Sequence, residues 1–304
     1  MDTISSLSSV DIFIIATGIL MGTIARLICL KIDSRQIPSY PTAYFNNIIL
    51  GFVAATLGAV AIPALLAKDY VAVTFLTIAA QQFREVRSAE MKSLGELEET
   101  EYTKRGAAYI DGISKTFESR NYLSLITALL SVLTMKIIPS KDLSLVLLCG
   151  ALIGILVMYL IYRFTKGKTV GDICTVKEAH FEIRGSELYA EGVFVTNYLG
   201  TEQSREFFSK EGVAIILTPN DQAGRITLEN FGQRQAILFE AIRMSGVRKY
   251  RFCRRDFDQG KVVIAFIPII KDMENLMKAI RLTPILENSQ KLGKRMKSMG
   301  EKNE

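Results

Sequence analysis

The sequence predicts an α-helical membrane domain with about five spans, followed by a cytoplasmic α+β domain. Long apolar blocks fill the first half of the 304-residue chain, and hydrophobic residues make up 49% of the whole. Near Lys166 these blocks give way to short apolar runs separated by polar turns, which are typical of a globular domain. We therefore expect a membrane domain at 1–165, an α+β domain at 166–286 and a basic tail at 287–304.

The clearest membrane signal is the apolar stretch 122–164. A helix needs about 20 apolar residues to cross about 30 Å of hydrocarbon. A polar turn bounded by Pro139 and Asp142 interrupts the stretch. The stretch therefore predicts two antiparallel spans, 122–138 and 143–164, that lie next to each other.

Two further spans are predicted at 12–32 and 45–66. In the first, Gly18 and Gly22 stand one helical turn apart, a spacing that lets another helix approach closely, although glycine is also common in membrane helices in general. Arg26 lies in the inner third of this helix, from which its long side chain can snorkel to the water. Acidic residues before this apolar core and basic residues after it argue against a cleavable signal peptide.

The segment 70–83 is shorter than a usual span, and it decides the predicted topology. Basic residues are concentrated at 31–35, 84–120 and 163–168, which the positive-inside rule places in the cytoplasm. All three stretches can lie there only if 70–83 crosses the membrane. We therefore predict an external N-terminus and a cytoplasmic C-terminal domain, with a four-span topology as the alternative. These flanks also explain the net charge of +6, so nucleic acid is not an expected partner.

The segment 84–121 is predicted to be a helical insertion on the cytoplasmic side. Glu101 and Arg105 have the stabilising i, i+4 order of an acid before a base. Apolar residues recur at helical spacing from Tyr109 onward. We therefore expect one helix over 104–138 that continues into the fourth span.

The second half of the chain predicts both strands and helices. Strands are expected at 180–184, 188–196, 213–217 and 225–228, with a hairpin of 247–254 and 262–269. Asn230 should cap a helix that Gly246 ends, with Ile237 in its buried stripe and Arg234 facing water. A last helix should begin at Asp272. The basic tail is expected either to bind an anionic bilayer surface weakly or to remain a solubilising tail.

The sequence shows no constellation typical of an enzyme. Its one histidine, His180, has no cysteine or carboxylate at ligand spacing, and its four cysteines form no CxxC pair. The GKT triplet at 167–169 lacks the strand and the first glycine of a phosphate-binding loop. We therefore expect no enzymatic activity, no cofactor and no metal site. An enzyme would have to use residues such as Asp111, Glu118 or Asp256, which no spacing recommends.

Two short stretches resemble a known family. Residues 109–114 read YIDGIS, and residues 229–241 read ENFGQRQAILFEA. Both resemble the YIEGIA family of membrane proteins found in endospore-forming bacteria, and the resemblance extends over most of the chain. In the hexapeptide Asp111 replaces the family's glutamate and Ser114 replaces its final alanine. Both changes are mild, because aspartate keeps the charge and serine keeps the small volume.

The resemblance implies an assembly role rather than a chemistry. The family is named for its motif, has no established enzymatic activity, and is associated with a small protein described as a capping subunit. Membership would therefore imply a membrane used in sporulation and a small soluble protein partner. It supplies no catalytic residues.

Two groups of residues are candidate sites. The hexapeptide is either a partner contact or a helix-packing motif inside the chain, and its members are Tyr109, Ile110, Asp111, Gly112, Ile113 and Ser114. The second group stands at the start of the predicted helix. It is either a contact for a ligand or partner, or a group that only caps the helix and is exposed to solvent. Its members are Gly232, Gln233, Arg234 and Gln235.

The leading hypothesis is a membrane anchor or scaffold of a sporulation-associated assembly, whose cytoplasmic domain binds a small protein. The alternative is a channel or permease subunit. Glycine faces formed by Gly18 with Gly22 and by Gly150 with Gly154, and a short third span near Pro63, indicate the alternative. The sequence leaves a homo-oligomer open.

Overall fold

The structure, a computed structural model, describes residues 8–33, 41–140, 142–165 and 167–290. The chain divides into two compact units. A helical unit comprises Met1–Lys92 and Ile113–Lys166, and a sheet unit comprises Ser93–Gly112 and Gly167–Glu304. From residue 291 onward, the predicted basic tail lies outside the described residues.

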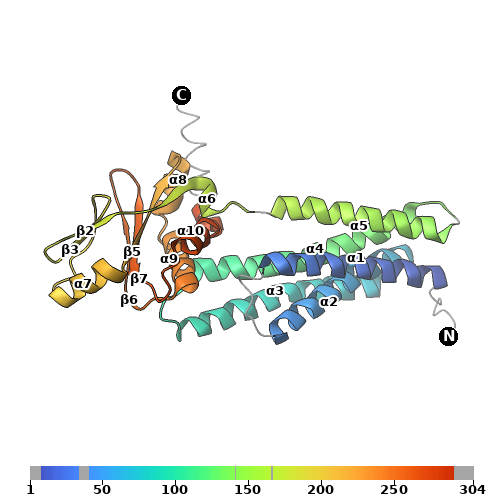
Figure 1. The fold of residues 1–304 in the computed structure, drawn as a ribbon. Coiled ribbons are helices and arrows are strands. Elements are labelled where there is room, and N and C mark those ends of the chain that lie inside the picture. The colour runs from blue at the N-terminus through green and yellow to red at the C-terminus, as the bar shows by residue number, and fades with distance from the viewer. Residues whose placement is uncertain (1–7, 34–40, 141, 166, 291–304) are drawn as a thin grey trace, which may run out of the picture. The chain divides into compact units, whose positions relative to one another are not determined.

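Long helices follow one another through the first part of the chain (Figure 1). They are α1 (Ser9–Asp33), α2 (Pro41–Leu66), α3 (Tyr70–Glu98), α4 (Ala107–Ile137) and α5 (Leu143–Thr165). Three segments are long and apolar enough to cross a membrane: Ser9–Cys29, Tyr44–Leu66 and Leu143–Arg163. They lie in α1, α2 and α5. The predicted spans 70–83 and 122–138 form parts of α3 and α4, and their crossing stays a prediction.

Glycines allow the helices of the helical unit to pack closely. A Cβ atom on Gly22 would lie 2.6 Å from the backbone oxygen of Ser124, and one on Gly58 would collide with the backbone oxygen of Leu125. The Ser124 hydroxyl also donates a hydrogen bond of 2.9 Å to the Gly22 carbonyl. The small-residue face of the first predicted span is therefore a site of helix contact.

Arg26 does not reach the water, so the expectation from the sequence was wrong. Its side chain is 1% exposed, and its Nη2 donates to the Asn47 Oδ1 at 2.5 Å. Its guanidinium carbon lies 5.4 Å from the centroid of the Phe117 ring. Gly51 makes room for this arrangement, because a Cβ atom there would collide with the methylene groups of Arg26. The hydrogen bond and the ring offset the cost of burying the charge.

The predicted helix 104–138 starts slightly later than expected. α3 ends at Glu98, and α4 begins directly after Gly106. Gly106 has a φ of +91°, a conformation that glycine adopts without steric cost and that breaks the helix. Its amide donates to the Glu98 Oε1 at 2.7 Å. We call residues 99–112, which belong to the sheet unit, the connector.

The sheet unit contains two antiparallel sheets. Its elements after the connector are α6 (Val170–Ile173), β1 (Cys174–Glu178), β2 (Phe181–Arg184), β3 (Glu187–Ala190), β4 (Val193–Thr196), α7 (Glu202–Glu211), β5 (Val213–Pro219), α8 (Gln222–Glu229), α9 (Phe231–Ser245), β6 (Lys249–Arg255), β7 (Val262–Ile267) and α10 (Met273–Arg281). The larger sheet has the strand order β1-β5-β7-β6, and the smaller has the order β2-β3-β4. All neighbouring strands run antiparallel.

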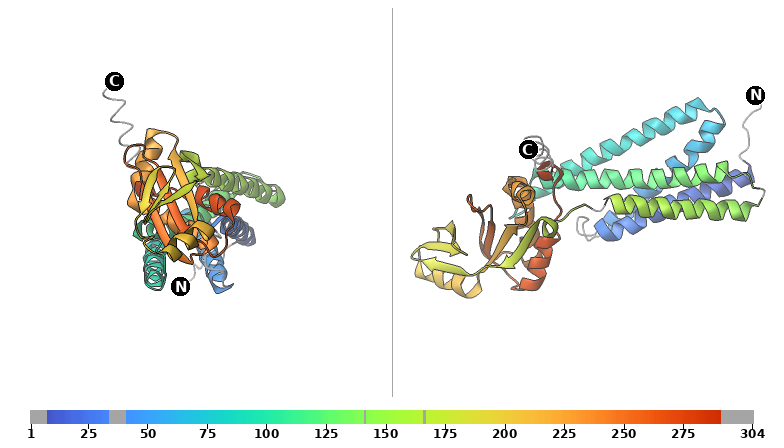
Figure 2. Two further views of the ribbon diagram at one scale, coloured as in Figure 1. Left: turned by 60° about the vertical axis from the view of Figure 1, so that its left-hand side comes forward. Right: turned by 90° about the horizontal axis from the view of Figure 1, so that it is seen from above.

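The larger sheet is covered on both faces (Figures 1 and 2). On one face Ile237 of α9 and Ile280 of α10 pack against alternate residues of the central strands. On the other face Phe208 of α7 and Leu188 of the smaller sheet pack against the remaining residues of the same central strands, which point to that side. Burial on both faces explains why β5 reads as a continuous apolar run. The structure thus confirms that a sheet-containing domain follows the apolar helices.

Some predicted elements were wrong, and others were missed. The predicted strand 225–228 is part of α8, because the Asp221 side chain accepts a 2.6 Å hydrogen bond from the Gly224 amide and starts a helix. The predicted strand 188–196 is divided into β3 and β4 by a turn at Gly192, where φ is +79°. No element was predicted from the sequence at α6, β1 or α7. The predictions of β5, α9, the β6–β7 hairpin and α10 are confirmed.

Candidate functional site

The two stretches that carry the family resemblance meet inside the sheet unit. Tyr109 lies near the start of α4, and its hydroxyl donates a hydrogen bond of 2.7 Å to the Oε1 of Glu240 in α9. Its ring meets the ring of Phe239 edge-on, with centroids 6.2 Å apart. Tyr109 and Glu240 are each 3% exposed. The hexapeptide's tyrosine is therefore an internal packing and hydrogen-bonding group of this unit.

The buried Glu240 has a second partner. Nη2 of Arg243 donates to its Oε2 at 2.6 Å, which offsets the cost of burying a carboxylate. Arg105 of the connector adds a further cation, with its guanidinium carbon 5.1 Å from the centroid of the Phe239 ring. Burial, and then the charge of Glu240, raise the pKa of Tyr109, so the phenol stays protonated and donates.

The other hexapeptide residues are divided between the two units. Ile110 is buried in the sheet unit, where Asp111 and Gly112 are half-buried. Ile113 and Ser114, which belong to the helical unit, are buried. Residues 109–114 thus carry α4 from one unit into the other, and most of their surface is covered.

Gln233, in the first turn of α9, holds a distant part of the chain. The Asn230 side chain caps the helix by accepting a 3.0 Å bond from the Gln233 amide. The buried side chain of Gln233 donates to the Pro284 carbonyl at 3.1 Å and accepts from the Leu286 amide at 2.8 Å and the Ser289 hydroxyl at 3.0 Å. Gln233 therefore fixes the chain after α10 against α9.

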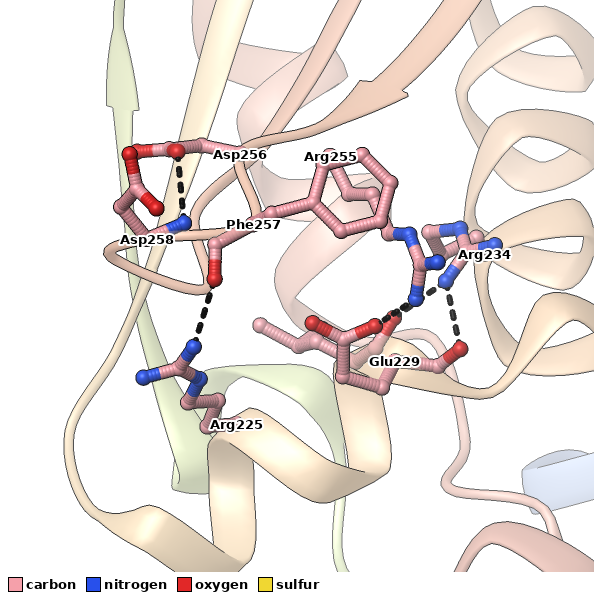
Figure 3. Close-up of polar contacts among 8 residues, drawn as sticks. Arg225, Glu229, Arg234, Arg255, Asp256, Phe257 and Asp258 are labelled. Atoms are coloured by element: carbon pink, nitrogen blue, oxygen red, sulfur yellow. Dashed lines mark hydrogen bonds and ion pairs between the residues drawn. The ribbon is translucent and has the colours of Figure 1, made fainter.

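Gly232 and Arg234 also have structural roles. A Cβ atom on Gly232 would lie 2.9 Å from the Cβ of Ala108, so glycine lets the start of α4 approach α9. Arg234 does not simply face water, as the sequence suggested. Its Nη1 donates to the carbonyls of Leu228 at 3.1 Å and Glu229 at 2.6 Å (Figure 3). Carbonyl groups at a helix end need donors from outside the helix, and Arg234 supplies them for α8.

A second arginine reaches the same end of α8. Arg255 of β6 forms an ion pair with the Glu229 carboxylate, and its guanidinium carbon lies 4.2 Å from the centroid of the Phe257 ring (Figure 3). Nη2 of Arg225 donates to the Phe257 carbonyl at 2.7 Å. These contacts fix the β6–β7 turn to α8.

A hollow of about 350 Å³ lies where the connector meets α9 and β6. It is lined by Tyr102, Thr103, Lys104, Phe231, Arg234, Gln235, Leu238, Arg251 and Cys253. Nε2 of Gln235 donates to the Lys104 carbonyl at 3.2 Å. Nη1 of Arg251 donates to the Thr103 hydroxyl at 2.8 Å and to the Tyr102 carbonyl. We call this site the connector hollow.

The structure brings only part of the second predicted group to the connector hollow. Arg234 and Gln235 line it, whereas Gly232 and Gln233 serve helix packing. Burial raises the pKa of Cys253 to about 11, and nearby Arg234 lowers it by a smaller amount. The thiol is therefore protonated at neutral pH and is not a nucleophile there.

A second polar feature runs through the helical unit. α4 carries four polar side chains at helical spacing, Asn121, Ser124, Thr127 and Ser131, each 0% exposed. The amide atoms of Asn121 and the hydroxyls of Thr127 and Ser131 have no hydrogen-bond partner among the described residues. Such groups are costly and rare in folded proteins. We call these four residues the α4 polar stripe.

Sequence reasoning missed Tyr102, Glu240 and Arg251. Glu240 stands inside the apolar run ILFEAI, and an acid at such a place is a signal of a buried partner. No local pattern links Tyr102 to Arg251, because their contact depends on the fold. Within the described ranges, no group of three or more His, Cys, Asp or Glu side chains could hold a metal ion.

Comparison with known proteins extends the resemblance of the two stretches. Residues 14–296 match the family described as YIEGIA protein. The uncharacterised protein YphB of Bacillus subtilis (strain 168) is 35% identical over 287 residues, which cover 91% of this chain and 93% of YphB. No solved structure matches the chain. Since the match includes almost all of both units, the protein belongs to the YIEGIA family.

Proposed function

We propose that the protein is a multi-pass membrane anchor or scaffold of a sporulation-associated assembly, and that its sheet unit binds a small protein in the cytoplasm. The supporting observation is the apolar outer surface of its helices. Leu20 of α1, Phe52 of α2 and Leu148 of α5 are 59%, 49% and 60% exposed. Apolar side chains on the outside of apolar helices are unfavourable in water and favourable in lipid.

The proposed topology has about five spans. Val71 and Phe75, in the first half of α3, are 82% and 68% exposed, which supports lipid contact along 70–83. The second half of α3 is charged from Arg84 onward and is assigned to the cytoplasm by the positive-inside rule. The segment 122–138 of α4 then returns through the membrane, and α5 completes the bundle.

The binding of a small protein partner rests on the family resemblance and on exposed rings of the sheet unit. Tyr198 and Phe257 are 71% and 68% exposed. Aromatic residues are enriched in protein interfaces, where they supply large contact areas at low entropic cost. A single partner that covers such rings would explain their exposure in the free chain.

Fusion proteins test the topology. Fluorescent and alkaline phosphatase fusions after Glu98 and at the C-terminus should give fluorescence and no phosphatase activity. An active phosphatase at the C-terminus would overturn the topology. Extraction with alkaline carbonate should leave the full chain in the membrane pellet.

The assembly role has its own test. Affinity purification from detergent-solubilised membranes of sporulating cells should recover one small protein in a constant ratio to the chain. Cells that carry the tag alone serve as the control. Repeated recovery of the chain by itself would count against the anchor role.

The α4 polar stripe favours a second candidate function, a channel or permease subunit. The hydroxyls of Thr127 and Ser131 lie inside an apolar bundle and have no hydrogen-bond partner within the described part of the chain. A path for polar species needs polar groups of this kind. Ion flux into liposomes with the full chain should exceed background and fall in Thr127→Val, with the exposed Ser144→Ala as the matched control. If the flux with the unmodified chain did not exceed background, the channel or permease function would be ruled out.

A further inference from the structure

We propose that the connector hollow binds a small anionic ligand that carries an aromatic ring, of the class of a nucleoside monophosphate. The site lies within the sheet unit, and its assignment does not depend on the proposed membrane function. The charge, the exposed rings and the size of the hollow support this assignment.

The charge of the hollow favours an anion. Lys104, Arg234 and Arg251 line it, and none of the described lining residues is acidic. The described hydrogen bonds of both arginines use Nη1 alone. A guanidinium has five N–H donors, so Nε and Nη2 of each arginine remain for a phosphate, which matches the fork of a guanidinium well. The bonds through Nη1 hold both cations in place before a ligand arrives, which lowers the entropic cost of binding.

The hollow also presents two exposed rings. Phe231 and Tyr102 are 72% and 66% exposed, and both line it. The guanidinium carbon of Arg251 lies 4.4 Å from the centroid of the Tyr102 ring, so one wall already consists of a cation stacked on a ring. Phe231 opens α9, whose N-terminal dipole adds positive potential at that end. Exposed rings beside fixed cations can stack on a base and bind its phosphate together.

The size of the hollow selects the class of ligand. Its volume of about 350 Å³ lies at the lower end of the range for small-molecule sites, about 300–1,000 Å³. A mononucleotide fits this volume better than a dinucleotide. Leu238 supplies an apolar contact for a ring, and the Oε1 of Gln235 is an acceptor for an exocyclic amino group. An acidic peptide shares the charge but has no ring to place between the aromatic side chains.

Calorimetric titration of the full chain in detergent micelles tests the proposal. The probes are AMP, GMP, CMP and UMP, with adenosine and inorganic phosphate as the two halves of one probe. At least one nucleotide should bind with a Kd below about 1 mM. Each half should bind at least about tenfold more weakly, because it engages only the rings or only the cations.

Variants on the rim localise the binding. Phe231→Ala should weaken it about 5- to 150-fold through lost stacking, and Lys104→Glu should weaken it through charge. Both side chains are exposed, so neither change should unfold the unit. The matched controls Tyr198→Ala and Lys177→Glu alter exposed residues outside the hollow and should leave the Kd unchanged.

Several results would overturn the proposal. One is the absence of binding heat with every nucleotide at 5 mM of the probe. Another is inorganic phosphate that binds as tightly as the nucleotide. A third is an equal loss of nucleotide affinity in the rim variants and the control variants. A tetraglutamate peptide that binds more tightly than every nucleotide would also overturn it, because the site would then recognise acidic protein segments.

Discussion

The Tyr109 hydroxyl donates to the Glu240 carboxylate across 131 positions of the sequence, and both groups are buried. The bond joins the family hexapeptide to α9, the other stretch that carries the family resemblance. Without Tyr109, the Glu240 carboxylate would keep Arg243 as its one partner among the residues that the structure describes. The hexapeptide tyrosine thus fixes the start of α4 on the sheet unit, whatever partner the protein binds.

Replacing Tyr109 by phenylalanine should therefore loosen this contact. Removing one partner of a buried hydrogen bond costs about 1–3 kcal/mol, because the remaining carboxylate oxygen loses its donor. Hydrogen–deuterium exchange of the full chain should show α9 amides opening more easily by that amount. Tyr198→Phe, on an exposed ring, is the control. Unchanged exchange in Tyr109→Phe would show that the bond contributes little.

Gln233→Leu should destabilise the sheet unit at a different place. The leucine would have a similar volume but would leave the buried Leu286 amide without its acceptor, whereas the Ser289 hydroxyl would keep the Leu286 carbonyl as its acceptor. We expect the free energy of unfolding to fall by about 1–3 kcal/mol because of the stranded amide, seen as a lower urea midpoint of the full chain. The control is Gln203→Leu on the exposed face of α7. Equal midpoints for the two variants would contradict the structural role of Gln233.

The sequence was most informative where local chemistry decides the structure. Asn230 and Gly246 bound α9 as predicted, because a cap and a stop are properties of a few neighbouring residues. The apolar run of β5 likewise predicted a strand. The segment 225–228 was wrongly predicted as a strand because its apolar residues suit a strand or a helix. The Asp221 side chain that starts the helix lies outside the segment.

Contacts between distant residues could not be predicted from the same patterns. Arg26 was expected to reach water, but its burial depends on the room left by Gly51 of another helix. Glu240 lies beside the buried stripe of α9, and its hydrogen-bond donor Tyr109 stands 131 positions away in the sequence. The connector hollow is lined by three separate segments of the chain, so no pattern in the sequence indicates that Lys104 and Arg251 lie close together.

Alkaline pH should weaken the fold in a defined window. Burial raises the pKa of Cys174 to about 12 and that of Cys253 to about 11, from the ordinary thiol value of 9.0. In the unfolded chain these thiols lose their protons near pH 9, whereas in the folded chain they keep them. The contribution of the two thiols to the free energy of unfolding is therefore fully present below pH 9. It is lost as the pH rises through the folded pKa values, by about 1.4 kcal/mol per pH unit for each group.

Urea midpoints of the full chain measured from pH 8 to pH 11 check this prediction. Cys174→Ala should make the fall between pH 9 and pH 11 shallower, because one of the two titrating groups is gone. The pKa of Tyr109 is also raised, so a further loss is expected above pH 10. A midpoint that stays constant up to pH 11 would contradict the assigned directions.

Two glycines in different surroundings should respond oppositely to the same substitution. A Cβ atom on Gly58 of α2 would meet the backbone of α4 at Leu125, which cannot give way as a flexible side chain would. Gly58→Ala should therefore cost about 1–3 kcal/mol through overpacking. Apart from its own helix backbone, a Cβ atom on Gly95 of α3 would meet no atom of the described residues within 4 Å, so Gly95→Ala should gain about 0.5–1 kcal/mol of helix stability. Thermal unfolding of both variants and of the unmodified chain in the same detergent measures the change in stability. A loss indicates a glycine that is needed for close helix packing, and a gain indicates a glycine that is not. If Gly58→Ala proved as stable as Gly95→Ala, α2 and α4 would not lie against each other at this point.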